Sequence, residues 1–169
     1  MMKKRLTSLA LSAMMVLSMV PATAFAAKDA GTPPTYNSAT GCYEISTPAQ
    51  LLYLAGKWKD GAPRDGHYVL TADIDMTGVK GFKPIASKKA EGFTGTFDGQ
   101  FHSIKGLRVE YEKKYAGLFG YVGNQNDQAY IKNVALLDCY VTGQQNVGAL
   151  AGVNYGTITD CVVTGEVKC

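Results

Sequence analysis

Two aspartates separated by one residue, Asp73 and Asp75, are the side chains most suggestive of chemistry; they lie in the segment Ala-Asp-Ile-Asp-Met. Because side chains alternate along a strand, both carboxylates would project to the same side. Such a pair can bind Ca²⁺ or, with a further carboxylate such as Asp98, cleave a polysaccharide. A solvated strand edge with Ile74 turned inward explains the same pattern, and we favour it because aspartate is mostly exposed in proteins.

The chain has two histidines, His67 and His102, which restrict the catalytic options. No His-Glu-x-x-His segment is present, so zinc-peptidase chemistry is not predicted. No Gly-x-Ser-x-Gly segment marks a nucleophile elbow. We expect His102 to be a structural residue hydrogen-bonded near Asp98, and we predict no catalytic, cofactor-binding or metal-binding residue and no enzymatic activity.

Six tyrosines offer binding rather than chemistry. On a rigid face, tyrosine rings stack on sugars or fill protein pockets with little loss of entropy. Core packing or scattered surface placement is the alternative for each one. The six are Tyr111, Tyr115, Tyr121, Tyr130, Tyr140 and Tyr155.

The N-terminus has the pattern of a secretory signal peptide. Met-Met-Lys-Lys-Arg precedes an uncharged stretch from Leu6 to Ala27, and Ala24-Phe25-Ala26 is a small-x-small cleavage pattern. An uncleaved membrane anchor is the alternative for about 20 uncharged residues. Ser, Thr and Pro21 dilute the stretch, so we predict cleavage after Ala26 and a secreted or cell-surface location.

Removal of the signal peptide changes the charge of the chain. The full sequence has 17 Lys and Arg against 14 Asp and Glu. Lys3, Lys4 and Arg5 account for the whole excess, so the mature chain is formally neutral. Nothing in this balance argues for nucleic acid or an anionic membrane as a partner.

A short helix precedes the rest of the fold. Residues 27–41 are polar and rich in Pro and Ser, and we expect a flexible arm there. Thr47 is a good N-cap, Pro48 suits the first helical position and Gln50 completes a capping box. Leu51, Leu54, Ala55 and Trp58 follow at helical spacing, so one face of this helix is apolar.

From His67 onward, short segments rich in Val, Ile, Tyr and Thr alternate with glycines, which is typical of an all-β protein. An I-x-x-φ-x-φ pattern, with φ apolar, recurs every 27 residues. Units of this length bury their apolar face only by stacking on neighbours, which predicts a parallel β-helix. One inward ladder would be Ile104, Ile131 and Ile158, and another Leu107, Val134 and Cys161. A Gly-rich β-sandwich is the alternative.

Two glycine-flanked apolar segments, 117–120 and 148–152, lie 32 residues apart. We expect Leu118 and Leu150 to point into the core. Their glycines would allow tight turns and close approach of neighbouring coils. These are Gly117, Gly120, Gly148 and Gly152. The interval exceeds 27 because the loop over residues 123–130 is longer than its counterpart over residues 154–157, and solenoids tolerate such insertions.

All four cysteines, Cys42, Cys139, Cys161 and Cys169, lie in the exported part, where disulfides are permitted. Three complete pairings are open, and no Cys-x-x-Cys pair suggests zinc. The ladder above predicts a buried thiol at Cys161. However, Cys139 and Cys161 share an Asp-Cys-x-Val-Thr-Gly context, and that register would allow a disulfide between them.

At these residues the chain resembles bacterial surface proteins that carry the GLUG motif, a Gly-Leu-x-Gly repeat. Gly117-Leu118-Phe119-Gly120 matches the motif directly, and residues 148–152 match a looser form with Ala149 in place of the first Gly. The likeness extends over Cys42 to Lys168.

The segment from Phe93 to Leu107 is similar to the block that commonly precedes these repeats. It contains Asp98, Gly99 and His102, while Phe101 replaces the usual Gly. The resemblance implies a right-handed parallel β-helix of the pectin-lyase-like type with an N-terminal capping helix. Related modules stand beside immunoglobulin-cleaving metallopeptidase domains and in adhesin-like proteins.

The expected organisation has four parts: a signal peptide (1–26), a flexible arm (27–41), an N-terminal cap with lead-in strands (42–92), and GLUG-type coils (93–169). After Val163 no further Gly-x-Leu-x-Gly segment appears before Cys169, so the last coil would be open. We therefore expect either continuation into a longer protein or end-to-end self-association.

We predict a non-enzymatic secreted or cell-surface β-solenoid module that serves as an adhesion, binding or spacer scaffold, as the N-terminal part of a larger surface protein. The expected partner is a host or bacterial glycan or an extracellular protein, with no cofactor, nucleic acid or membrane involved. One alternative is an exported carbohydrate-active enzyme or accessory domain that uses Asp73, Asp75 and Asp98. A purely structural stalk is another.

Overall fold

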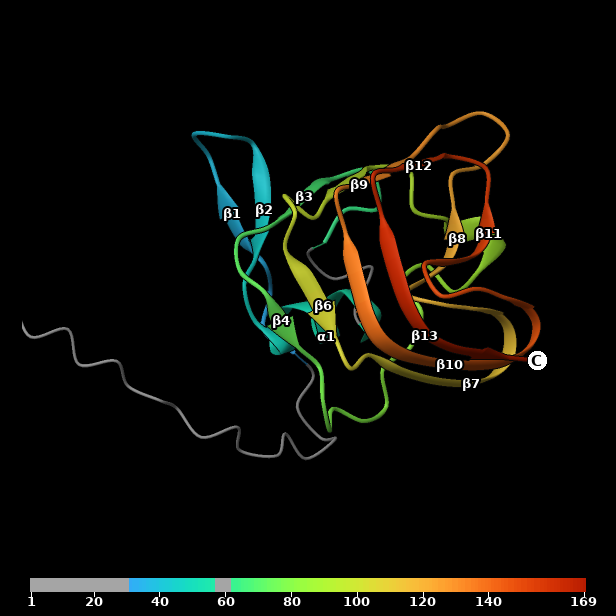
Figure 1. The fold of residues 1–169 in the computed structure, drawn as a ribbon. Coiled ribbons are helices and arrows are strands. Elements are labelled where there is room, and N and C mark those ends of the chain that lie inside the picture. The colour runs from blue at the N-terminus through green and yellow to red at the C-terminus, as the bar shows by residue number, and fades with distance from the viewer. Residues whose placement is uncertain (1–30, 57–61) are drawn as a thin grey trace, which may run out of the picture.

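The structure is a computed structural model that describes residues 31–56 and 62–169. Short strands wind into a β-solenoid of about three turns (Figure 1). The expected all-β parallel β-helix with one short N-terminal helix is confirmed. The predicted signal peptide and Trp58 lie outside the described residues.

Three sheets form the faces of the solenoid, and all their strand pairs are parallel except β1–β2. The first contains β1 (Thr35–Asn37), β2 (Cys42–Ile45), β3 (His67–Leu70), β5 (Thr96–Asp98), β9 (Tyr130–Lys132) and β12 (Thr157–Thr159). The second contains β4 (Ile74–Asp75), β6 (Ser103–Lys105), β7 (Arg108–Ala116), β10 (Ala135–Val147) and β13 (Val162–Lys168). The third pairs β8 (Phe119–Val122) with β11 (Ala151–Asn154). Between β4 and β5 lies the short 3-10 helix η1 (Lys89–Glu91).

The N-terminal helix α1 (Pro48–Gly56) begins where the sequence predicted. The Gln50 backbone N–H donates to Thr47 Oγ1 at 3.3 Å, as in a capping box. The reverse bond differs by one residue, because Gln50 Oε1 accepts from the Ser46 N–H at 2.8 Å. Leu51 and Leu54 are buried, so the apolar face of the helix packs onto the core.

The expected flexible arm differs from the structure over its last residues. Thr35–Asn37 form β1, which pairs antiparallel with β2. Two contacts stabilise this hairpin: Asn37 Nδ2 donates to Glu44 Oε1 at 2.7 Å, and the rings of Tyr36 and Tyr43 lie 5.0 Å apart. The polar composition of the arm gave no sign of this pairing.

The apolar ladders run through the stack, but the predicted alignment is wrong in the first coil. Ile131 pairs with Ile158 as expected, yet its partner in the preceding coil is Phe97. Ile104 instead pairs with Leu136, which pairs with Val163. The longer β8–β9 loop causes the error, because it sets the interval between Ile104 and Leu136 at 32 residues and not 27.

The second predicted ladder changes for the same reason. Val134 and Cys161 are neighbours, since the next residues along, Ala135 and Val162, are paired. Leu107 instead lies beside Cys139, because Arg108 pairs with Tyr140. Cys161 is half-buried, not fully buried.

The Gly-Leu segments pack where the coils touch. Leu118 and Phe119 are fully buried, while Leu150 is only partly buried against the core. A Cβ at Gly120 would lie 2.7 Å from the Ser87 Cα, so only glycine lets these backbones approach. None of the four motif glycines has a positive φ, so none of them forms a left-handed turn. The left-handed corners are instead at residues such as Asn133 and Asp160, types that tolerate this conformation.

Candidate functional site: a tyrosine-lined cleft

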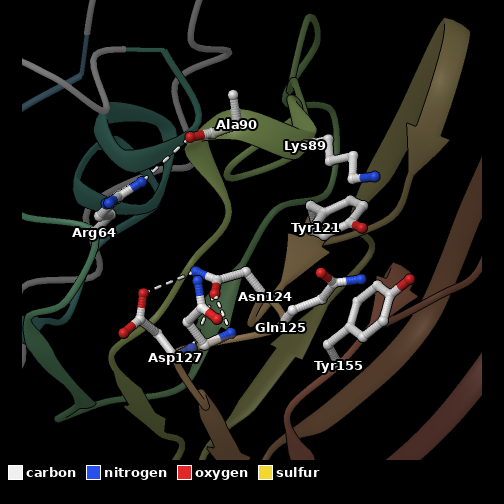
Figure 2. Close-up of a pocket in the computed structure, with 9 residues that line it drawn as sticks. Arg64, Lys89, Ala90, Tyr121, Asn124, Gln125, Asp127 and Tyr155 are labelled. Atoms are coloured by element: carbon white, nitrogen blue, oxygen red, sulfur yellow. Dashed lines mark hydrogen bonds between the residues drawn. The ribbon is translucent and has the colours of Figure 1, made fainter.

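The β8–β9 loop (residues 123–129) bounds a cleft of about 320 Å³. The loop between β8 and β9 is five residues longer than the equivalent loop between β11 and β12. The added residues project from the stack beside η1 and the segment before β3 (Figure 2). The lining residues are Arg64, Lys89, Ala90, Tyr121, Asn124, Gln125, Asn126, Asp127 and Tyr155.

Asn124 fixes the conformation of this loop. Its Oδ1 accepts the backbone N–H groups of Asn126 at 2.7 Å and Asp127 at 2.9 Å. Its Nδ2 donates to Asp127 Oδ2 at 3.0 Å, and its backbone N–H donates to the Asp127 carbonyl oxygen. Asparagine mimics a backbone turn in this way, so these bonds define the turn of the loop.

Three tyrosines contact one another beside the cleft, and two of them, Tyr121 and Tyr155, line it. Tyr121 and Tyr155 stack with ring centroids 5.6 Å apart, and Tyr115 contacts Tyr121 edge-on at 5.5 Å. Tyr121 is 4% exposed and Tyr155 is 50% exposed, so one ring supports the other. Burial, and then a hydrogen bond with the Tyr155 side chain, raises the pKa of Tyr121 above its ordinary value.

The charged groups around the cleft are unequally paired. Arg64 Nη1 donates to the Ala90 carbonyl oxygen at 3.3 Å, and within the described ranges neither Arg64 nor Lys89 forms an ion pair with a carboxylate. The neighbouring Lys88, by contrast, lies 3.6 Å from Glu91 Oε1. With Asp127 held by Asn124, the cleft has two cations and one anion.

The other predicted tyrosines lie away from this cleft. Tyr140 lies under Arg108, whose guanidinium carbon is 4.3 Å from the ring centroid, and Lys168 Nζ is 5.4 Å from the same ring. Tyr111 lines a separate hollow of about 230 Å³, and Tyr130 on β9 is exposed. The six tyrosines therefore do not form one face, and among them only Tyr115, Tyr121 and Tyr155 lie together.

The predicted aspartates have structural contacts: Asp73 bonds to another coil and Asp75 to its own turn. Ser103 donates from its backbone N–H to Asp73 Oδ1 at 2.7 Å, and Thr77 donates to Asp75 Oδ1 at 2.9 Å. Bonds from Ser103, with a smaller contribution from His102, hold the pKa of Asp73 below its usual range, and bonds from Thr77 do the same for Asp75. Ile74 between them is buried, as the favoured interpretation required.

Asp98 and His102 do not interact as predicted. His102 Nδ1 lies 3.4 Å from Asp73 Oδ1, because the chain turns through Gly99–His102 toward the β4 corner. Asp98 Oδ1 accepts from the Gln100 N–H and from Asn133 Nδ2, and Asp98 Oδ2 lies 3.3 Å from Lys132 Nζ. A Cβ at Gly99 would clash with the Asn133 carbonyl oxygen, which explains why glycine follows Asp98.

The disulfide that the sequence allowed between Cys139 and Cys161 does not form. Cys139 and Cys161 are both free thiols, as are Cys42 and Cys169. The stacking register places Cys161 beside Val134, and it pairs Cys139 with Gly165. The shared Asp-Cys context therefore does not put the two sulfurs in line. Burial raises the pKa of both thiols, which disfavours their reactive thiolate forms.

No three His, Cys, Asp or Glu side chains in residues 31–56 and 62–169 converge as a metal ion would require. In the same ranges, no helix is long and apolar enough to span a membrane.

Sequence reasoning missed Arg64, Lys89 and the amide-rich loop as parts of a site. Two signals were present: the loop is five residues longer than its counterpart, and Tyr121 and Tyr155 both lie next to a glycine beside that position of the repeat. The contributions of Arg64 and Lys89 could not be found, because they come from irregular segments of the preceding turn.

Known proteins resemble this chain over most of its length. No family model matches it. It is 34% identical over 142 residues to "Halomucin" of Haloquadratum walsbyi and 34% identical over 130 residues to a "Putative Gly-rich membrane protein" of Evansella cellulosilytica. These matches cover 76% and 72% of this chain but only 2% and 14% of the two relatives. The chain is thus similar to a small part of long proteins of surface or membrane type.

A solved structure has the same fold. It is a crystal structure from Bacteroides ovatus, described as "a putative immunoglobulin A1 protease", with a TM-score of 0.61 and 22% identity. The match covers 81% of this chain and 40% of that one. At this identity the likeness establishes the β-solenoid architecture and nothing about activity.

Proposed function

We propose that this chain is a non-enzymatic β-solenoid module of a secreted or cell-surface protein, which binds an extracellular ligand as an adhesive or scaffolding part. The observation that carries the proposal is the ordered cleft, where a half-exposed Tyr155 is supported by Tyr121 and faces a pre-formed loop. Rigid, pre-organised aromatic sites bind with little ordering cost.

The electrostatics of the aspartates support a non-enzymatic role. A glycosidase needs one carboxyl group with a raised pKa to act as a general acid. In Asp73 and Asp75, hydrogen bonds lower the pKa; in Asp98, partial burial alone would raise it, but bonds from Asn133, Gln100 and Lys132 outweigh that effect. All three carboxylates are thus held ionised by hydrogen bonds, within a turn for Asp75, to another coil for Asp73, and of both kinds for Asp98.

Observations other than the cleft also support the assignment to an extracellular surface protein. The Gly-Leu-Phe-Gly segment supports membership of the GLUG-motif proteins, and the signal-like N-terminus supports export with cleavage after Ala26. Both relatives are far longer than this chain, which supports a role as one module of a larger surface protein.

The test is to incubate the exported chain with a panel of plant, bacterial and host glycans and immobilised glycoproteins. Saturable binding without new reducing ends is expected. New reducing ends would overturn the non-enzymatic assignment. If no member of the panel bound saturably, the binding role would be overturned and a spacer role would remain.

A further inference from the structure

The apolar part of the cleft is a single aromatic face. Tyr155 is half-exposed, and its ring is held against Tyr121, which in turn contacts Tyr115. This surface is wide enough for one ring-shaped ligand to stack on, while the buried Tyr121 prevents the outer ring from collapsing.

The rest of the lining is polar. Gln125 and Asn126 provide side-chain amide groups, which both donate and accept hydrogen bonds, while the amide of Asn124 is used within the loop. Pockets for apolar ligands are mostly hydrophobic, whereas this one combines one aromatic face with amides. A pyranose has the matching chemistry, with a C–H face to stack and hydroxyls to pair. The volume of about 320 Å³ lies near the lower limit of small-molecule sites, roughly 300 Å³, and suits one or two sugar rings.

The charge of the cleft selects the kind of sugar. Figure 2 shows Arg64 across the hollow from Tyr155, and Lys89 near Tyr121. Neither cation has a carboxylate partner in the described chain, and Arg64 uses one donor on the Ala90 carbonyl oxygen, which leaves further donors of its planar group for a ligand. The planar guanidinium matches a carboxylate, and the single negative charge of Asp127 disfavours a dianion such as phosphate.

We propose that this cleft binds a pyranose that carries a carboxylate, an acidic sugar unit of an extracellular glycan. The ring stacks on Tyr155, the amides of the β8–β9 loop bind its hydroxyls, and Arg64 and Lys89 bind its carboxylate. This inference rests on the proposed binding function and names the ligand class of the same site.

Isothermal titration calorimetry of the exported chain tests the proposal with three sugars. Oligogalacturonate represents the uronic acids of polysaccharides, sialyllactose represents the sialic acids of glycoproteins, and lactose is the neutral reference. At least one acidic sugar is expected to bind about 10-fold more tightly than lactose at low salt. The preference should shrink as the ionic strength rises. The acidic sugar that binds identifies the source.

Matched variants place the binding in the cleft. Lys89→Gln should reduce acidic-sugar affinity by roughly 5–10-fold and leave lactose unaffected, while Lys88→Gln, a neighbour paired with Glu91, should change neither. Tyr155→Ala should abolish binding of every sugar, whereas Tyr36→Ala, at 56% exposure, should have no effect. Thermal unfolding checks that each variant folds, and Tyr155→Phe, which keeps the ring, should retain binding.

Two failures are distinguishable. Equal affinity for acidic and neutral sugars, or wild-type affinity in Tyr155→Ala and Lys89→Gln, would overturn this inference and leave the binding function in place elsewhere on the chain. If no glycan or glycoprotein bound the wild-type chain saturably, the proposed function would fall with it.

Discussion

A single carboxylate, Asp98, joins two coils of the solenoid. Its Oδ1 accepts from Asn133 Nδ2 at 3.0 Å, and its Oδ2 lies 3.3 Å from Lys132 Nζ, both in the next turn. Asn133 has a left-handed backbone with φ of 54°, so its side chain helps to hold a corner that the backbone alone disfavours. Asp98 is therefore a structural residue of the coil boundary.

Asp98→Asn should lower the unfolding temperature at pH 7 by about 2–4 °C, since a charge-assisted contact is worth on the order of 1 kcal/mol. The folded-state pKa of Asp98 lies below its unfolded value, so this stabilisation is present above the unfolded pKa, about 3.8. It is lost as the pH falls through the folded pKa. The difference between the calorimetric melting temperatures of the two proteins should stay constant from pH 7 to about pH 5 and should narrow as the pH falls from there to pH 3.

The control is Asp160→Asn, a change of the same type at another left-handed corner, where the side chain makes no hydrogen bond within the described residues. It should shift the melting temperature little at any pH. A constant difference between wild type and Asp98→Asn down to pH 3 would contradict the assigned role. The sequence suggested that Asp98 is structural, but its partner could not be predicted because the turn after Gly99 carries His102 toward Asp73.

At the scale of elements, the sequence predicted the coils correctly but the pairing register of their strands only in part. The apolar pattern was sufficient to predict the coils and the alignment of Ile131 with Ile158, and the capping residues predicted the start of α1. It misaligned Ile104, because strands of three residues carry too few side chains to fix a register, and the loop length decides which turn they pair with. The cleft depends on that same loop, which explains why both were missed together.

We expect that the β8–β9 loop can be shortened without unfolding the solenoid. Deleting residues 124–128 would make the step from Val122 to Tyr130 as short as that from Asn154 to Thr157. Shorter loops cost less closure entropy, by about 0.6 kcal/mol per halving, so we expect an unchanged or slightly raised unfolding temperature. Binding of the acidic sugar should be lost. Circular dichroism melting and calorimetric titration measure the two effects.

Deleting Asn133 alone is the contrasting change. It removes one residue from the tight β9–β10 corner and would turn the side chains of β10 to the wrong face, so the chain should unfold. If the five-residue deletion also unfolded the chain, the loop would be part of the core and not an insertion on it.

At the scale of the whole molecule, the described stack is covered at one end and open at the other. Helix α1 and the β1–β2 hairpin pack against the first turn, while β13 is exposed along its length (Figure 1). Val163 and Val167 continue the ladders of the buried Leu136 and Val141, yet they are 41% and 44% exposed. Inward positions that remain exposed indicate a surface suited to pairing with another coil.

We therefore expect a chain of residues 27–169, taken alone, to self-associate through the open edge of β13 in a concentration-dependent manner. The double substitution Val163→Lys and Val167→Lys should make it monomeric, because lysines at these positions block strand pairing and apolar stacking. Val162→Lys is the matched control, since Val162 pairs with Ala135 on the outward side of the strand and should not change association. Sedimentation velocity over a hundredfold concentration range measures the effect. A wild-type chain that stays monomeric, or a double variant that associates equally well, would show that β13 does not drive assembly.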